Sequence, residues 1–393
     1  MSAEPRSCAS CNEVACDMHK QLRALDAPAE RVAWVLDDVW PETASMVSAS
    51  FGQGDQMIAP GFFGPWPAKY RWPVITRHAG ALATGRRHWS MRTVANASGA
   101  LRQQSYLDHD RLLARQLAKH IDYRARHLVV AQSWLPWLDE AGVFGGRTFD
   151  VVMSRYPFGE IHRLLDQAAN EIGASATIAD FRAPVGLVER EAELLARARR
   201  IYTPHHGIAS LFPGQAVRLS WHKPPARRRS PGNRVAFLGP TIARQRPDFA
   251  RRLAAGLEEP LVVFGAMLEP TWDGLRIERR QWGPNWLEGI GAILHPATLT
   301  NQPRPLLEAA VSGVAIFATK PAACPNRTIG RSISFRARNA VQALEGAWAD
   351  CLGRAIPSDS GSSRRCRWTT TYFISASSTE PCAFPRQASS AAA

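Results

Sequence analysis

The chain has no long uninterrupted run of apolar residues. None of its windows approaches the roughly 18 consecutive apolar residues that a transmembrane helix needs, so the sequence predicts no membrane-spanning segment. The first residues, MSAEPRSCAS, lack the basic stretch followed by an apolar stretch that marks a secretory signal. We therefore expect no Sec export and a cytoplasmic location.

Lysine is scarce, although the chain is strongly basic. The formal charge is +14 at pH 7, yet lysine occurs only at positions 20, 69, 119, 223 and 320. The basic run with interleaved aromatic residues that is typical of a nucleic-acid surface is also missing. The run Arg227-Arg228-Arg229 stands among prolines and is interpreted as a solvated linker. We expect no nucleic-acid partner, whereas attraction to phosphate-bearing substrates, or a peripheral contact with an anionic membrane surface, stays open.

Cysteine is too sparse for a disulfide framework, since there are only seven in a chain expected to be cytoplasmic. A leader over residues 1–30 contains Cys8, Cys11, Cys16 and His19, four side chains of the kind that bind zinc. Structural zinc sites usually place their two ligand pairs farther apart. We therefore favour a mobile leader with reduced thiols, and a metal site made of these four residues is the alternative.

Short apolar segments alternate with helical ones over residues 31–221, which favours a mostly parallel α/β sheet. Residues 51–73 are rich in Gly, Pro and aromatic residues and are expected to form a long ordered loop. The expected strands are RVAWV, HLVVAQS, FDVVMSR and RIYTP, and the expected helices are DRLLARQLAKHI, GEIHRLLDQAA and EREAELLARARR.

A second alternation begins after a proline-rich linker at residues 222–233. It predicts strands at 234–239, 261–265, 291–297 and 314–319, and helices at 247–257 and 303–313. The second domain is assigned to residues 234–355, and the Ser/Arg/Thr-rich residues 356–393 are expected to be a disordered tail. The fold class is therefore α/β, with two Rossmann-like domains between an irregular leader and tail.

Two segments of the second domain resemble a known family. FLGPTIARQRPDFARRL, followed by ILHPATLTNQPRPLLEAAVSGVAIFAT, is similar to the donor domain of GT-B glycosyltransferases of the retaining, family-four type. The resemblance covers about 85 residues and implies two domains that face each other across a cleft, with a nucleotide-sugar donor as substrate. It implies no required cofactor, because helix N-termini and cations can hold the donor diphosphate without a protein-bound metal.

The resemblance also implies roles for individual residues. Glu308 matches the carboxylate that binds the ribose hydroxyls, and Arg244 lies where the family places a cation against the diphosphate. The expected donor-binding residues are Gly239, Thr241, Arg244, Gly265, Thr300, Asn301 and Glu308. In the first domain, Asp37 and Asp38 end the first strand, where either could orient an acceptor hydroxyl or act as the base, although a turn aspartate is equally ordinary.

Two positions depart from the family pattern. Gln245 stands where a lysine is usual, and Thr300 replaces the first of the two paired glutamates. We therefore predict a hexosyl-type glycosyltransferase that acts on a saccharide, lipid-linked or small-molecule acceptor, with a catalytically inactive sugar- or nucleotide-binding relative as the first alternative. An Arg-rich nucleic-acid-binding protein is the second, and a steep salt dependence of DNA or RNA affinity would support it.

Overall fold

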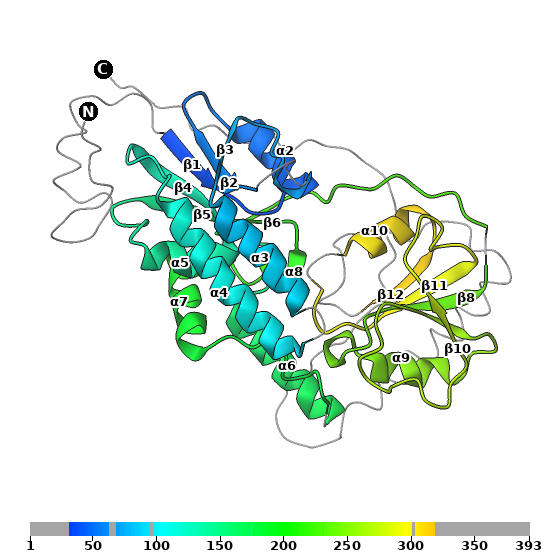
Figure 1. Cartoon of the computed structure of the whole chain (residues 1–393). Coiled ribbons are helices and arrows are strands. Elements are labelled where there is room, and N and C mark those ends of the chain that lie inside the picture. Colours follow the sequence, from blue (N-terminus) through cyan, green and yellow to red (C-terminus); the bar gives the residue numbers. More distant parts are fainter. Residues whose placement is uncertain are drawn as a thin grey trace.

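Two parallel β-sheets divide the chain, and in the computed structural model each is covered by helices (Figure 1). The structure describes residues 31–318, except 63–67, 95–96, 174, 231 and 301–302. We call residues 31–218 the N-domain, 219–233 the connecting segment and 234–318 the C-domain. The predicted α/β class is confirmed, because every pair of neighbouring strands in both sheets is parallel.

The N-domain sheet has seven strands in the order β3-β2-β1-β4-β5-β6-β7. The strands are β1 (Arg31–Val35), β2 (Gln56–Pro60), β3 (Thr76–Ala79), β4 (Ala125–Ala131), β5 (Thr148–Val152), β6 (Ile201–Thr203) and β7 (Ala216–Arg218). The α-helices are α2 (Pro41–Ser50), α3 (Ala81–Thr93), α4 (Gly99–Ala118), α5 (Leu135–Glu140), α6 (Phe158–Ile172), α7 (Val185–Arg197) and α8 (His206–Ala209). The last three residues of β1 and all of β4 except Arg126 are buried, and these central strands pack with the helices into one hydrophobic core.

The C-domain sheet has five strands in the order β10-β9-β8-β11-β12. They are β8 (Arg234–Leu238), β9 (Leu261–Phe264), β10 (Ile277–Arg280), β11 (Ile290–His295) and β12 (Ala315–Ala318), with helices α9 (Pro247–Ala254) and α10 (Arg304–Val311). Its two faces pack into separate hydrophobic clusters, one that includes residues of α9 and one that includes residues of α10. Each sheet reverses its strand order at the centre, between β1 and β4 in one and between β8 and β11 in the other.

The structure corrects the expectation for residues 51–73. The predicted long loop contains β2, which pairs with the edge strand β3 and with β1 and whose residues from Met57 to Pro60 are buried. Its short apolar run was hidden by the Gly- and Pro-rich residues around it. The edge strands β3, β7 and β10 were also missed, because an edge strand needs no continuous apolar pattern.

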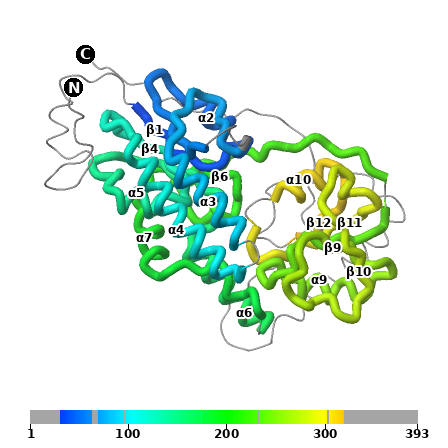
Figure 2. The backbone as a smooth tube through the Cα atoms, viewed as in Figure 1, coloured from blue at the N-terminus to red at the C-terminus, as the bar shows by residue number. Residues whose placement is uncertain are grey.

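The connecting segment runs along one side of the molecule from the N-domain to the C-domain (green in Figure 2). Two of its arginines, expected to lie in a solvated linker, also contact the C-domain, and Arg227 stays exposed while it does so. Arg229 donates to the backbone oxygens of Ser312, Ile290 and Gly313, and Arg227 pairs with Glu308. Cations at the carboxyl end of a helix stabilise it, and Arg229 satisfies the carbonyl groups that follow α10. The segment is thereby fastened to the C-domain.

Polar contacts join the two domains directly. Glu269 of the C-domain accepts from Ser175 Oγ at 2.6 Å and from Thr177 Oγ1 at 2.5 Å. A second contact is made by Glu42 on α2, whose side chain is completely buried. It pairs with Arg304 at the start of α10 and accepts from the backbone N–H of His222 at 2.6 Å. The start of α10 is therefore fixed to the N-domain.

Removing one partner of the Glu42–Arg304 pair should have an asymmetric effect on stability. Arg304→Ala leaves a buried carboxylate with only the His222 N–H, whereas Glu42→Gln keeps an acceptor oxygen for that N–H and leaves Arg304 one-third exposed. We expect Arg304→Ala to lower the free energy of unfolding by about 2 kcal/mol and Glu42→Gln by less than about 1 kcal/mol. Urea denaturation measures both values.

The control is Arg252→Ala, which removes an exposed pair with Asp248 on α9 and should cost less than about 0.5 kcal/mol. Equal losses for Arg304→Ala and Arg252→Ala would show that burial of Glu42 does not govern the pair.

Two expected absences concern the described residues only. No helix among them combines the length and apolar character required to cross a bilayer. Within the same ranges, no three His, Cys, Asp or Glu side chains gather closely enough to hold a metal ion. Cys8, Cys11, Cys16 and His19 lie outside these ranges, as do the predicted leader and tail, so those predictions stay as they are.

Candidate functional site

A pocket of about 320 Å³ opens at the carboxyl edge of the C-domain sheet. It lies where β8 and β11 end, which is the point at which the strand order reverses. Loops diverge at such a point and leave a crevice, which is where open α/β sheets bind ligands. The lining residues are Leu238, Gly239, Arg244, Gln245, Trp282, His295, Leu299, Thr300, Pro303, Pro305 and Leu306, all from the C-domain. One of them, Leu299, also packs into the N-domain core, so the pocket adjoins the other domain.

Two glycines shape the floor of this pocket. A Cβ atom on Gly239 would lie only 2.2 Å from the backbone oxygen of Phe264, so no larger residue fits between β8 and β9. Gly265 has φ +83°, a left-handed conformation that side chains disfavour. Together they let the two strand ends close up beneath the pocket. Gly239 lines the pocket, whereas Gly265 is not among the lining residues and lies against the backbone of Gly239 and Pro240.

Arg244 is the only charged side chain among the lining residues that the structure describes. It lies on the 3-10 turn Ala243–Gln245, and its guanidinium is stacked on Phe181 of the N-domain at 4.0 Å from the ring centroid. Burial, with a smaller contribution from the positive charge of Arg102, lowers the pKa of Arg244 to about 10. Its Nε atom is buried without a hydrogen-bond partner. A buried cation with an unused donor is suited to an anionic ligand.

Two neutral polar side chains next to Arg244 also have unused atoms. His295 Nε2 is 2.7 Å from Thr300 Oγ1, whereas its Nδ1 is buried without a partner. Burial lowers the pKa of His295 to about 4, so the ring is neutral near pH 7. Gln245 Oε1 is buried and unpartnered in the same way. Buried polar atoms are normally paired, so three unpaired ones around a single pocket indicate a polar ligand.

An aromatic wall closes one side of the pocket. Trp282, which follows β10, is 46% exposed and rests on Phe264, with ring centroids 4.8 Å apart, and on Trp286 at 5.1 Å. An exposed indole with a fixed ring plane can stack on a nucleobase or a sugar. The sequence analysis missed this residue, although the dense tryptophan spacing in QWGPNW was a usable signal.

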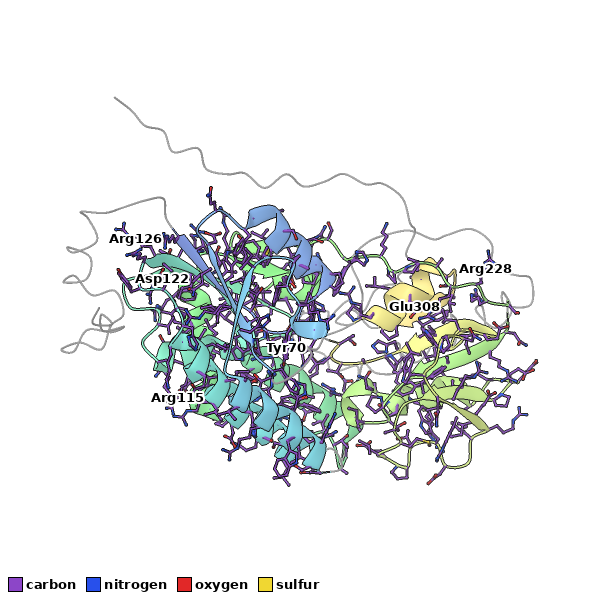
Figure 3. The ribbon with its side chains drawn as sticks, turned by 45° about the horizontal axis from the view of Figure 1, so that its top comes forward. Tyr70, Arg115, Asp122, Arg126, Arg228 and Glu308 are labelled. Carbon is purple, nitrogen blue, oxygen red and sulfur yellow. The ribbon has the colours of Figure 1, made fainter. Side chains whose placement is uncertain are left out.

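Glu308 is close to this wall but is not among the pocket-lining residues. It lies on α10 (Figure 3), accepts from the indole N–H of Trp286 at 3.2 Å and pairs with Arg227 of the connecting segment. Its side chain is 18% exposed. The carboxylate is thus hydrogen-bonded to Trp286, which in turn contacts Trp282. The predicted contact of Glu308 with ribose stays a prediction.

The remaining predicted donor residues are placed differently. Thr300 lines the pocket, but Thr241 is fully buried in the core and its Oγ1 accepts from Trp272 Nε1 at 2.9 Å. Asn301 lies outside the described residues. Arg246 lies two residues after Arg244, which was predicted to bind phosphate. It does not line the pocket and instead pairs with Asp248 and with Glu171 of the N-domain.

Asp37 and Asp38 follow β1, at the central reversal of the N-domain sheet. Arg87 on α3 donates to both carboxylate oxygens of Asp37, the shorter contacts being 3.2 Å. Asp38 is 3.1 Å from Lys69, and burial together with the charge of Asp37 raises the pKa of Asp38. Asp38 is also the more open side chain, 41% exposed against 14% for Asp37, so it is the better placed of the two to meet a ligand from solution.

The N-domain contributes a cation that sequence reasoning missed. Arg102, in the first turn of α4, is near enough to Arg244 for their charges to interact, and its Nε is likewise buried without a partner. The charges of both arginines interact with the carboxylate of Asp180. Two arginines from different domains around one carboxylate leave a net positive charge beside the pocket, which an anion would offset.

Comparison with known proteins finds structural similarity to glycosyltransferases of low sequence identity. No family model matches it, and no curated protein matches its sequence. Among solved structures it is similar to TarM, with 10% identity, 58% of this chain and 50% of TarM covered and a TM-score of 0.39, so it spans half of TarM's length. It is similar to HepE of Anabaena in complex with UDP and glucose, with 10% identity, coverage of 83% and 92% and a TM-score of 0.41. It is also similar to CalG4, the calicheamicin glycosyltransferase, with 12% identity, coverage of 81% and 84% and a TM-score of 0.37.

Proposed function

We propose that this chain is a GT-B glycosyltransferase that moves a sugar from a nucleotide-sugar donor to an acceptor hydroxyl. The pocket at the carboxyl edge of the C-domain sheet supports this proposal most directly, because it combines Arg244, whose Nε is buried without a hydrogen-bond partner, with an exposed, stacked Trp282. A nucleoside diphosphate has the matching groups, an anionic end and a flat base. The pocket of about 320 Å³ is within the usual range for small-molecule sites.

Within this proposal each domain has its own task. Arg244 and Arg102 offset the charge of the diphosphate, which grows as the sugar departs. His295 and Gln245 offer neutral hydrogen-bonding atoms to the sugar or phosphate. Asp38 receives the proton of the acceptor hydroxyl, and its raised pKa makes it a better base than an ordinary aspartate. A hexosyl donor and a cytoplasmic location are part of the proposal. Retention of configuration is also part of it, and it requires the acceptor to attack from the face of the sugar that the diphosphate leaves.

A ligand screen followed by a turnover assay tests the function. Nucleoside diphosphates should raise the melting temperature of the purified protein, because a ligand that binds only the native state stabilises it. Slow release of free sugar from the matching nucleotide sugar should then be detected without any added acceptor. If no nucleoside diphosphate shifts the transition at millimolar concentration, the proposal is wrong.

Replacing Glu308 tests whether its carboxylate binds ribose. Glu308→Ala should weaken binding of the preferred ribonucleoside diphosphate about tenfold, because a charge-assisted hydrogen bond contributes about 1.5–3 kcal/mol and the competing Arg227 contact offsets part of it. Binding of the 2′-deoxy analogue should change less, so the preference for ribose should shrink. Isothermal titration calorimetry measures both affinities.

Trp286→Phe is the matched control, because it removes the indole N–H that Glu308 accepts while keeping an aromatic ring in the wall. It should leave the preference for ribose intact. If Glu308→Ala weakens the binding of the ribonucleotide and of its 2′-deoxy analogue equally, the carboxylate supports the aromatic wall rather than contacting ribose.

A catalytically inactive nucleotide-binding protein is the second candidate. It is favoured by Thr300, which occupies the place of the family's first glutamate and is engaged with His295. With no carboxylate among the described lining residues, the pocket offers no acidic partner to the sugar hydroxyls. Such a protein would give saturable binding in the screen and no sugar release.

A further inference from the structure

Several large exposed apolar side chains lie close together in the sequence of the N-domain. Nine large apolar residues are exposed among those that the structure describes, and five of them fall between positions 75 and 106. Ile75 is 93% exposed, Leu82 79% and Trp89 69%, followed by Leu101 and Tyr106. Single exposed apolar residues are ordinary, but a concentration of them on one surface marks an interaction site.

The same part of the chain contains no acidic residue. Residues 71–107 hold six arginines and neither Asp nor Glu, whereas 34 acids in 393 residues would correspond to about three in 37. Arg87 turns inward to Asp37 and Asp110, and the Nε of Arg102 is buried beside Arg244. The arginines at positions 71, 77, 86 and 92 are exposed. The exposed charges within this segment are therefore all basic.

Helix α3 brings both features onto one face. Leu82, Arg86 and Trp89 are spaced four and three residues apart, so they lie on the same side of the helix. The opposite side holds the buried Ala83 and Thr84. Helix α3 lies against α4 (Figure 1). The outward face of α3 thus carries two large apolar side chains and an arginine, so it offers apolar contact and a positive charge on the same side.

We propose that this face of α3 binds an anionic lipid surface. Trp89 and Leu82 enter the boundary between headgroups and acyl chains, where indole rings are favoured, and Arg86 and Arg92 contact lipid phosphates. An anionic bilayer is favoured over a nucleic acid because Leu82 and Ile75 are aliphatic and offer no ring on which a base could stack. No residue of α3 lines the pocket, so this inference does not depend on the proposed function.

Vesicle co-sedimentation of the purified full chain tests the proposal. The protein should pellet with vesicles of phosphatidylcholine mixed with phosphatidylglycerol, much less with phosphatidylcholine alone, and less as salt is raised. Leu82→Ser with Trp89→Ser should weaken binding roughly tenfold or more, and so should Arg86→Gln with Arg92→Gln, because each surface arginine and each buried apolar group contributes substantially.

Matched variants keep the test specific. Arg126→Gln with Arg228→Gln removes two exposed charges elsewhere (Figure 3), and Val185→Ser removes a 72% exposed apolar residue on α7. Both should bind vesicles like the unmodified protein, and circular dichroism should show every variant folded. The proposal is overturned if the α3 variants bind vesicles as well as these controls do, or if neither vesicle type pellets the protein. It is also overturned if the arginine variant loses binding only to a single-stranded oligonucleotide.

Discussion

Arg244→Ala is expected to weaken nucleoside diphosphate binding about 100-fold while changing the affinity for the corresponding nucleoside less than about twofold. The guanidinium is buried, its Nε has no partner and the charge of Arg102 opposes it. All three conditions favour the site with an anion bound over the site without one. A charge-assisted hydrogen bond in such surroundings contributes near the upper end of the usual range.

The same change should have little effect on the protein without ligand. Deleting a buried, repelled charge removes an unfavourable desolvation that offsets the lost stacking on Phe181, so the free energy of unfolding should change by less than about 1 kcal/mol. Calorimetric titration and urea denaturation give the two quantities, with Arg252→Ala on the exposed face of α9 as control. A large loss of stability with unchanged diphosphate affinity would assign Arg244 to the domain interface instead.

Much of the C-domain could be predicted from the sequence, because its central strands are buried on both faces. VAFL in β8 and LVVF in β9 are continuous apolar runs, which parallel central strands require. Strand β10 carries Arg279 and Arg280 and could not be recognised, because it is an edge strand with little burial. Local patterns thus predicted the interior of each sheet better than its margins.

The candidate site was predictable only where backbone geometry decides it. Gly239 and Arg244 follow the central strand, so parallel topology alone brings them to the ligand-binding edge. Trp282, His295 and Arg102 act through the packing of several elements, which no local pattern reveals. For the same reason the surroundings of Glu308 could not be predicted, because its partner Arg227 comes from a segment interpreted as a solvated linker.

Arg87, Asp37 and Asp110 form a cluster in the N-domain where such packing shifts a pKa. Arg87 lies between Asp37 and Asp110, at 3.2 Å from each, so one guanidinium serves two enclosed carboxylates. One cation can offset only one of the two negative charges. Burial, together with the charge of Asp37, raises the pKa of Asp110 to about 7 despite the opposing effect of Arg87.

The contribution of Asp110 to stability should therefore fall as the pH rises from about 4 to about 7. In this window the unfolded chain has lost the proton of Asp110, whereas the folded protein still holds it, so the part of the free energy of unfolding that depends on Asp110 decreases with pH. Ionisation of Asp110 accounts for a loss on the order of 4 kcal/mol. Asp110→Asn is neutral at every pH and should remove this loss, so its stability relative to the unmodified protein should rise across the window.

Urea denaturation near the two ends of this pH window measures the effect, and Asp108→Asn is the control, since Asp108 lies exposed on the same helix and only accepts from Gln104 at 2.9 Å. A parallel pH dependence in the unmodified protein and Asp110→Asn would show that Asp110 is already ionised in the native state. If the unmodified protein loses stability with pH relative to Asp110→Asn, Asp110 is protonated in the native state, and Arg87 is then paired with Asp37 alone. That pairing keeps Asp37 occupied and leaves Asp38, with its more open carboxylate, as the base available to an acceptor.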